Sequence, residues 1–140
     1  MKTKMKIKLD EGARLPSRAH EADAGLDLFA RETAIIYAKE NHIFDTGVHV
    51  ELPNNTVGFL KSKSGLYMNH GITSEGVLDE GYTGSIRVNL VNYSDTPYIV
   101  NKGDKISQIV ILPILKPTLE VVDSLEETER GENGFGSSGK

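Results

Sequence analysis

Cysteine is absent from this chain of 140 residues. That absence excludes disulfide bonds, metal sites built from thiolates and cysteine nucleophiles, and it suits a cytoplasmic protein. Long apolar runs are absent as well. The basic start of the chain, residues 1–6, is not followed by the apolar stretch of about 7–15 residues that a signal peptide needs, and nothing approaches the ~20 apolar residues of a membrane span. We therefore expect a cytoplasmic protein with no membrane partner.

Positive charge is also scarce. The chain has 16 Lys and Arg residues against 20 Asp and Glu residues, so its formal net charge is −4 and its pI is near 5.6. Binding to duplex nucleic acid needs clustered cations that replace the phosphate counterions. We expect no direct nucleic-acid partner. The net charge does not exclude a local basic pocket. The length suits one domain with its own hydrophobic core.

Apolar and polar residues alternate with the two-residue period of β-strands. Ile86, Val88 and Leu90, for example, are separated by polar residues, which is the pattern of a half-buried strand. Similar runs lie at residues 6–9, 26–30, 43–52, 56–61, 98–101, 106–115 and 119–122, with Gly, Pro, Asn and Asp supplying the turns. Only residues 64–69 favour a helix. Many short strands at this spacing predict an all-β jelly roll or barrel.

Two regions depart from this pattern. Residues 106–115 are apolar on both faces of a strand, so we expect a subunit interface to cover the second face. From residue 123 onward the composition turns acidic and then rich in Gly and Ser, with almost no core-forming side chain except Phe135. We therefore divide the chain into a β domain, residues 1–122, and a flexible C-terminal arm, residues 123–140.

Five short segments combine glycine with groups suited to chemistry. They are residues 22–28 (ADAGLDL), 61–66 (KSKSGL), 76–84 (GVLDEGYTG), 103–109 (GDKISQI) and 130–139 (RGENGFGSSG). Each has an ordinary interpretation when taken alone. The first is a turn before a strand, the second a helix start with solvated lysines, the third a β-hairpin, the fourth a turn into a strand and the fifth a frayed end.

Chemical interpretations are open for the same segments. Free N–H groups at a helix start, with a serine hydroxyl and a lysine, suit phosphate oxygens. The third segment offers backbone groups for a base edge, Asp79 to accept a proton from water and Tyr82 to pack against a sugar. In the fifth, Arg130 suits phosphate and Phe135 suits a base, with the glycine-rich backbone becoming ordered around the ligand.

In this order and over most of the chain, the five segments resemble the five motifs of the homotrimeric dUTPase family. The third and fifth segments carry the resemblance most strongly. It implies a distorted jelly-roll subunit and a homotrimer whose active sites lie at the interfaces, each closed by the C-terminal arm of a neighbouring subunit. It also implies a Mg²⁺-assisted dUTP diphosphatase, which forms dUMP and pyrophosphate and limits uracil in DNA.

The same resemblance implies a role for each site residue. Asp79 would activate the water that attacks the α-phosphorus, and Asp27 would support Mg²⁺ through bound water. Tyr82 would exclude a 2′-hydroxyl, and the backbone at Val77 and Leu78 would bind the uracil edge. Phe135 would stack on uracil. The remaining positions would hold the phosphate chain: Lys63, Ser64, Gly65, Gln108, Arg130, Gly136 and Ser137.

Three positions depart from the family pattern. Lys63 stands where an Arg is usual, so a point charge replaces a planar two-point contact with phosphate. Asn133 stands where Gly is common, which slightly stiffens the arm while still allowing left-handed backbone. The segment at residues 73–75 is shorter and more acidic than in some relatives, so the sequence does not indicate which backbone groups complete the uracil pocket.

Two alternative functions stay open. A dCTP deaminase, or a bifunctional deaminase and diphosphatase, would need a catalytic acid near the base, for which Glu75 and Glu80 are the nearby glutamates. A non-catalytic dUTP-binding module would bind without hydrolysis. The order of residues 76–79 and the arm favour attack by water on phosphorus. An added regulatory protein partner is compatible with the sequence.

Overall fold

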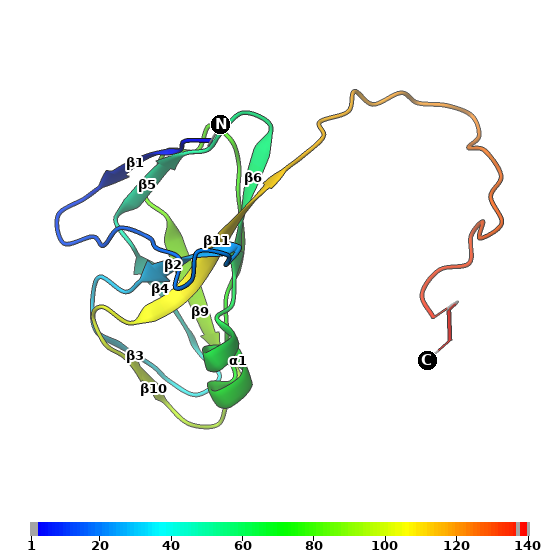
Figure 1. Cartoon of the computed structure of the whole chain (residues 1–140). Helices are drawn as coiled ribbons and strands as arrows, with labels where there is room; N and C mark the ends of the chain where they lie inside the picture. The colour runs from blue at the N-terminus through cyan, green and yellow to red at the C-terminus, as the bar shows by residue number, and fades with distance from the viewer. Residues whose placement is uncertain (1–2, 137, 140) are drawn as a thin grey trace.

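The computed structural model describes residues 3–136 and 138–139. In this part of the chain, eleven strands and one short helix follow one another (Figure 1) in this order: β1 (Lys6–Leu9), β2 (Gly25–Phe29), β3 (Ala34–Ile36), β4 (Asn41–Asp45), β5 (Val48–Glu51), β6 (Thr56–Lys61), α1 (Ser64–His70), β7 (Ile72–Thr73), β8 (Glu75–Leu78), β9 (Arg87–Asn92), β10 (Tyr98–Val100) and β11 (Lys105–Pro113). No helix among the described residues is long and apolar enough to cross a membrane.

Four antiparallel sheets surround one hydrophobic core. The largest has the strand order β2-β11-β6-β8, a second has the order β4-β9-β7, and β1-β5 and β10-β3 form two-stranded sheets. β9 shows how the sequence builds them, because Val88, Leu90 and Asn92 are buried while Arg87 and Asn89 are exposed. The predicted all-β, jelly-roll-like subunit is confirmed, and α1 begins at the predicted residue and ends one residue later than predicted.

The predicted strand 43–52 is in fact two strands. β4 ends at Asp45 and β5 begins at Val48, so that β4 pairs with β9 and β5 with β1. Gly47 has a φ of 69°, a left-handed conformation that glycine adopts without strain. Beside it, the buried Thr46 donates its hydroxyl to the carbonyl oxygen of Ile86 at 2.6 Å. This turn sends the chain from one sheet into another, which an alternating pattern cannot indicate.

The predicted strand at residues 119–122 is wrong. β11 ends at Pro113, and beyond it Leu119 and Val121 are 88% and 98% exposed. Figure 1 shows this part of the chain leaving the body of the subunit. Alternating apolar residues form a stable strand only when other strands pair with them, and these residues run away from the strands of their own subunit.

Asn92 is the most buried polar side chain of β9. Its Nδ2 donates to the carbonyl oxygens of Ile36 and Thr96 at 2.9 and 2.8 Å, and its Oδ1 accepts from the backbone and hydroxyl of Ser94. We expect Asn92→Ala to lower the free energy of unfolding by about 2–4 kcal/mol, because it leaves buried carbonyl groups unpaired. Asn89→Ala, on the exposed face of the same strand, should cost no more than about 0.5 kcal/mol. Urea unfolding measures both, and equal losses would contradict the prediction.

Candidate functional site

Asp27 is the centre of one group of predicted site residues. It lies on β2 with 2% of its surface exposed, and Lys63 Nζ lies 2.5 Å from its Oδ1 while Lys105 Nζ lies 3.2 Å from its Oδ2. Burial by itself raises the pKa of Asp27, but hydrogen bonds from Lys63 and Lys105 outweigh it, so that the pKa lies below its ordinary value. Two ammonium groups around one carboxylate leave a net positive charge, which suits a phosphate ligand.

Gln108 joins Asp27 because of the strand register. On β11 it pairs with Asp27 of β2 on one side and with Lys61 of β6 on the other. Its Nε2 donates to the carbonyl oxygen of Ser62 at 3.1 Å. A Cβ atom at Gly25 would lie 2.0 Å from Gln108 Oε1, so only glycine permits this approach. We call Asp27, Lys63, Lys105 and Gln108 the Asp27 cluster.

The start of α1 lies beside this cluster. Lys63 precedes the helix in an extended conformation, and no side chain caps the helix start. Ser64 and Gly65 are exposed, and a Cβ atom at Gly65 would meet nothing within 4 Å. The N–H groups of the first helical turn are therefore open to a ligand, as the phosphate-binding prediction for these residues requires.

A magnesium ion at Asp27 would need ligands from the substrate. The described residues contain no group of three or more His, Cys, Asp or Glu side chains that could hold a metal ion. Mg²⁺ prefers oxygen ligands and retains several of its water molecules. Both oxygens of Asp27 are paired with lysine ammonium groups, so a Mg²⁺ ion beside this carboxylate would have to arrive with its phosphate oxygens and its own water molecules.

Lys63→Met tests the electrostatics of the Asp27 cluster. The substitution removes one of two cations on the carboxylate, so the pKa of Asp27 rises. In the native chain Asp27 stabilises the fold above its ordinary pKa of 3.8 and loses this contribution as the pH falls through its lower folded value. As the pH is lowered, we expect the thermal unfolding midpoint of Lys63→Met to begin falling at a higher pH than that of the native chain. Lys61→Met, which disrupts the exposed pair with Glu75, is the control. Identical curves of thermal midpoint against acidic pH for Lys63→Met and the native chain would contradict the prediction.

The other group of predicted residues surrounds Asp79. After β8 the chain turns, with the Tyr82 N–H donating to the carbonyl oxygen of Asp79 at 3.1 Å. Asp79 is exposed, and a pocket of about 220 Å³ is lined by Val77, Leu78, Asp79, Tyr82 and Arg87. We call residues 79–86 the Asp79 loop. It is not the predicted β-hairpin, because β8 pairs with β6 while β9 pairs with β4 and β7.

β8 forms an edge of the largest sheet. Its described partner is β6, and Leu78 pairs with Gly58. An edge strand presents backbone N–H and C=O groups on its outer side. Val77 and Leu78 therefore combine free backbone groups with the adjacent pocket, which is the arrangement that recognition of a base edge requires.

The two groups lie far apart within one subunit. One row of paired residues crosses the largest sheet: Asp27, Gln108, Lys61 and Glu75. Glu75 ends this row three strand spacings away from Asp27, and Asp79 follows Glu75 by four residues along the chain. Together these two offsets separate Asp79 from Asp27 by roughly 20 Å. A triphosphate chain, with two P–O–P bridges between its α- and γ-phosphorus, is much shorter. One subunit therefore does not bring the Asp27 cluster and Asp79 to one ligand.

The C-terminal arm lies apart from both groups. The last backbone hydrogen bond before the arm lies just after β11, where the Ile114 N–H donates to the carbonyl oxygen of Asn55 at 2.9 Å. Farther along, Arg130 Nε donates to the carbonyl oxygen of Asn133 at 2.7 Å, and the ring of Phe135 is fully exposed. Gly136 has a left-handed φ of 88°. The predicted residue Ser137 lies outside the described residues.

Two cations of these groups were not predicted as site residues. Lys105 reaches Asp27 next to a register shift between Lys105 and Ser107, and such a bulge has no clear sequence signal. Arg87 begins β9 and lines the pocket beside Asp79. Its place three residues after the end of the third glycine-containing segment is the signal that could have found it.

The candidate deaminase acids are engaged in ion pairs. Lys116 Nζ lies 2.6 Å from Glu80 Oε1, and the Asn55 N–H donates to the same oxygen at 2.7 Å. The Lys116 hydrogen bond, followed by the Asn55 bond, lowers the pKa of Glu80. Glu75 pairs with Lys61 at 2.9 Å. A carboxyl group that must deliver a proton needs a raised pKa, so the contacts of Glu80 disfavour it as the acid of a deaminase.

Comparison with known proteins identifies the family. The dUTPase family model matches residues 11–139. The deoxyuridine 5'-triphosphate nucleotidohydrolase of Clostridium kluyveri is 45% identical over 135 residues, which cover 94% of each chain. The solved structure of Staphylococcus bacteriophage 80alpha dUTPase with dUpNHpp has a TM-score of 0.93 and 33% identity, and the match covers 99% of this chain and 100% of that chain.

A second solved structure bears on the metal. A mutant dUTPase from phage phi11 of S. aureus, described with the coordination of a structural Mg(II) ion, has a TM-score of 0.84 and 30% identity, covering 89% of this chain and all of that one. The match of the family model spans both groups of site residues and most of the arm, and the identity to the C. kluyveri protein extends over nearly the whole of both chains. The chain described here belongs to the dUTPase family.

Proposed function

We propose that the chain hydrolyses dUTP to dUMP and pyrophosphate at active sites shared between the subunits of a homotrimer. The observation that carries this proposal is the family match over residues 11–139, which contains the Asp27 cluster, the Asp79 loop and the arm together. The solved phage 80alpha relative contains dUpNHpp, a nucleotide with a dUTP-like chain. The substrate of this chain is inferred from that likeness.

The proposed chemical step begins at Asp79. Its carboxylate orients a water molecule and accepts a proton as the water oxygen attacks the α-phosphorus. The bond from that phosphorus to the oxygen bridging to the β-phosphate breaks, and pyrophosphate leaves. Asp79 and Tyr82 line the same pocket, so the water and the deoxyribose would lie side by side.

Base and sugar recognition is assigned to the residues around the same pocket. The outer backbone groups of Val77 and Leu78 would pair with uracil, whose donor and acceptor pattern differs from that of cytosine. The Tyr82 ring is held by its hydroxyl, which donates to the carbonyl oxygen of Ser85 at 2.8 Å. A ring fixed in this way would leave no space for a 2′-hydroxyl, so UTP would be a poor substrate.

The phosphate chain is assigned to the Asp27 cluster and the arm. Lys63, with Ser64, Gly65 and Gln108, would bind the phosphate oxygens, and Lys105 would add a second cation. Mg²⁺, when bound next to Asp27, would neutralise charge on the leaving pyrophosphate. The arm would then close the site, with Phe135 on uracil and Arg130, Gly136 and Ser137 at the phosphates.

Two features of the single subunit support the proposed homotrimer. The Asp27 cluster and Asp79 are roughly 20 Å apart in one chain, counted along the sheet. Near the end of β11, Leu112 and Leu115 are 41% and 92% exposed, which leaves apolar surface for another subunit to cover. Cyclic symmetry would bring the Asp79 loop of one subunit to the Asp27 cluster of a second.

The proposal is tested by measuring pyrophosphate release from dUTP, dCTP, dTTP and UTP in Mg²⁺ buffer, with ammonia measured in parallel. We expect pyrophosphate from dUTP at least about 10²-fold faster than from the other nucleotides, because a missing or misplaced hydrogen bond in a polar site costs several kcal/mol. Ammonia from dCTP would support the deaminase alternative. Binding of dUTP without any product would support the non-catalytic module.

A further inference from the structure

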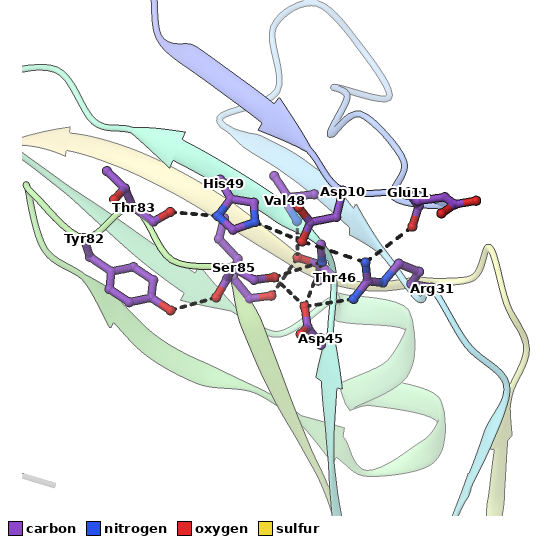
Figure 2. A network of polar contacts seen from close by, with 12 residues as sticks. Asp10, Glu11, Arg31, Asp45, Thr46, Val48, His49, Tyr82, Thr83 and Ser85 are labelled. Carbon is purple, nitrogen blue, oxygen red and sulfur yellow. Dashed lines mark hydrogen bonds and ion pairs between the residues drawn. The ribbon is translucent and has the colours of Figure 1, made fainter.

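A polar network fastens the Asp79 loop to the N-terminal part of the chain (Figure 2). At its centre is His49 of β5. Its Nδ1 lies 2.7 Å from the carbonyl oxygen of Thr83, and its Nε2 lies 3.0 Å from Asp10 Oδ2. A carbonyl oxygen and an ionised carboxylate accept hydrogen bonds and donate none. A neutral imidazole has one N–H and can serve one of them, whereas the protonated ring donates to both.

We propose that protonated His49 is a positioning residue, which holds the Asp79 loop in the shape that presents Asp79 and Tyr82 to the substrate. This inference rests on the proposed function, because the loop is assigned to dUTP turnover there. His49 acts through the backbone of Thr83, the neighbour of Tyr82, and does not itself line the pocket of Asp79.

The place of Thr83 in the loop explains why this bond matters. At one end of the loop, the Tyr82 N–H closes a turn onto Asp79. At the other end, the Ile86 N–H donates to the carbonyl oxygen of Val48 at 2.8 Å. Thr83 lies between these two anchors and is exposed to solvent. The bond from His49 therefore restrains the exposed middle of the loop, next to the ring that would contact the sugar.

The charges around His49 favour its protonated form. The hydrogen bond to Asp10, and then the bond to Thr83, raise the pKa of His49 above its ordinary value of 6.5, although burial and Lys8 oppose them. The hydrogen bond from His49 in turn lowers the pKa of Asp10. His49 makes both hydrogen bonds at pH values above the lowered pKa of Asp10 and below the raised pKa of His49. As the pH rises through the latter, the ring loses a proton and one of its two bonds.

Other charged groups surround the pair. Arg31 NH1 lies 3.9 Å from Asp10 Oδ2, and Arg31 NH2 lies 3.3 Å from Asp45 Oδ1. Asp45 also accepts hydrogen bonds from the Ser85 hydroxyl and from a backbone N–H of the β4–β5 turn. Lys6 and Glu51 line the shallow pocket next to His49 and pair with each other at 3.4 Å. The network thus joins the Asp79 loop to residues 10–11, to Arg31 and to residues 45–49.

His49→Gln is the first variant of the test, because glutamine is uncharged and does not span both acceptors. At about pH 6 we expect its KM for dUTP to rise roughly three- to tenfold, with a smaller change in kcat, which corresponds to loss of one charge-assisted hydrogen bond. The difference should shrink as the pH rises and the native ring loses its proton. His42→Gln, which alters a histidine paired with Glu32 at 3.1 Å, is the matched control and should leave KM unchanged.

Asp10→Asn separates positioning by charge from mere packing. Asparagine keeps the size of the side chain and an oxygen acceptor but removes the carboxylate that holds the proton on His49. The pH at which KM begins to rise should therefore move to a lower value than in the native chain. An unchanged profile in Asp10→Asn, together with native KM values in His49→Gln at about pH 6, would overturn the inference.

Hydrogen exchange reports on the loop without turnover. In His49→Gln at about pH 6, we expect faster exchange of the Tyr82 and Ile86 amides than in the native chain and in His42→Gln. Equal protection in all three proteins would overturn the inference. If the native chain releases no pyrophosphate from dUTP, the proposed function fails, whereas the exchange result still decides whether His49 holds the loop.

Discussion

Asp79→Asn is expected to slow pyrophosphate release from dUTP by about 10²–10⁴-fold, the usual contribution of a positioned general base. Asparagine has nearly the same shape as aspartate but does not accept a proton from water. Because Asp79 is exposed in the loop after β8, the substitution should change the free energy of unfolding by no more than about 0.5 kcal/mol. Steady-state kinetics in Mg²⁺ buffer measure the rate.

Asp95→Asn is the matched control for this variant. Asp95 is also an exposed aspartate, with a side chain 93% accessible and paired with Lys39 at 3.4 Å, but it lies in the turn between β9 and β10. Its removal should leave turnover unchanged. A rate for Asp79→Asn within about threefold of the native rate would show that another group activates the water.

Deletion of residues 123–140 is expected to lower kcat/KM for dUTP by at least about 10²-fold, because loss of the closing residues misplaces the phosphate chain. Arg130 and Phe135 are lost in this variant. The thermal midpoint should change little, since the described side chains of the arm lie in solvent and not in the core. An active truncated chain would contradict the role proposed for the arm.

Mixing the two inactive variants tests whether sites are shared. Asp79→Asn supplies an intact arm, and the truncated chain supplies an intact Asp79. After joint unfolding and refolding in equal amounts, about a quarter of the sites in a cyclic trimer would combine both if these parts come from different subunits. Recovered activity at that level supports shared sites. A mixture as inactive as its components would show that the arm and Asp79 of each site belong to one chain.

The alternation of apolar residues was a sufficient guide to most of the sheet. Val88 and Leu90 point inward as their period predicts, and β11 lies within two residues of its predicted bounds. What the pattern did not reveal was where the chain changes sheets. Gly47 breaks one predicted strand because the next residues pair with β1 instead of β9, and pairing partners are a property of the folded chain.

The sequence proposed a set of site residues but not their arrangement. The order of the five segments placed Asp27, Lys63 and Gln108 in the motifs. In the structure the strand register pairs Gln108 with Asp27, and Lys63 reaches Asp27 through an ion pair. Neither that order nor the spacing showed that Asp79 lies roughly 20 Å from Asp27 within one subunit. Distances of this kind depend on sheet order, which the sequence pattern leaves open. His49 was not predicted to have a role, because an isolated histidine on a strand has no distinguishing signal in the sequence.

Hydrolysis of dUTP in water enriched in ¹⁸O, with mass analysis of both products, tests the proposed mechanism most directly. Attack by an Asp79-activated water on the α-phosphorus predicts one heavy oxygen in dUMP and none in pyrophosphate. Label in pyrophosphate would place the attack on the β-phosphorus and contradict the proposed mechanism, and the absence of both products would contradict the proposed function.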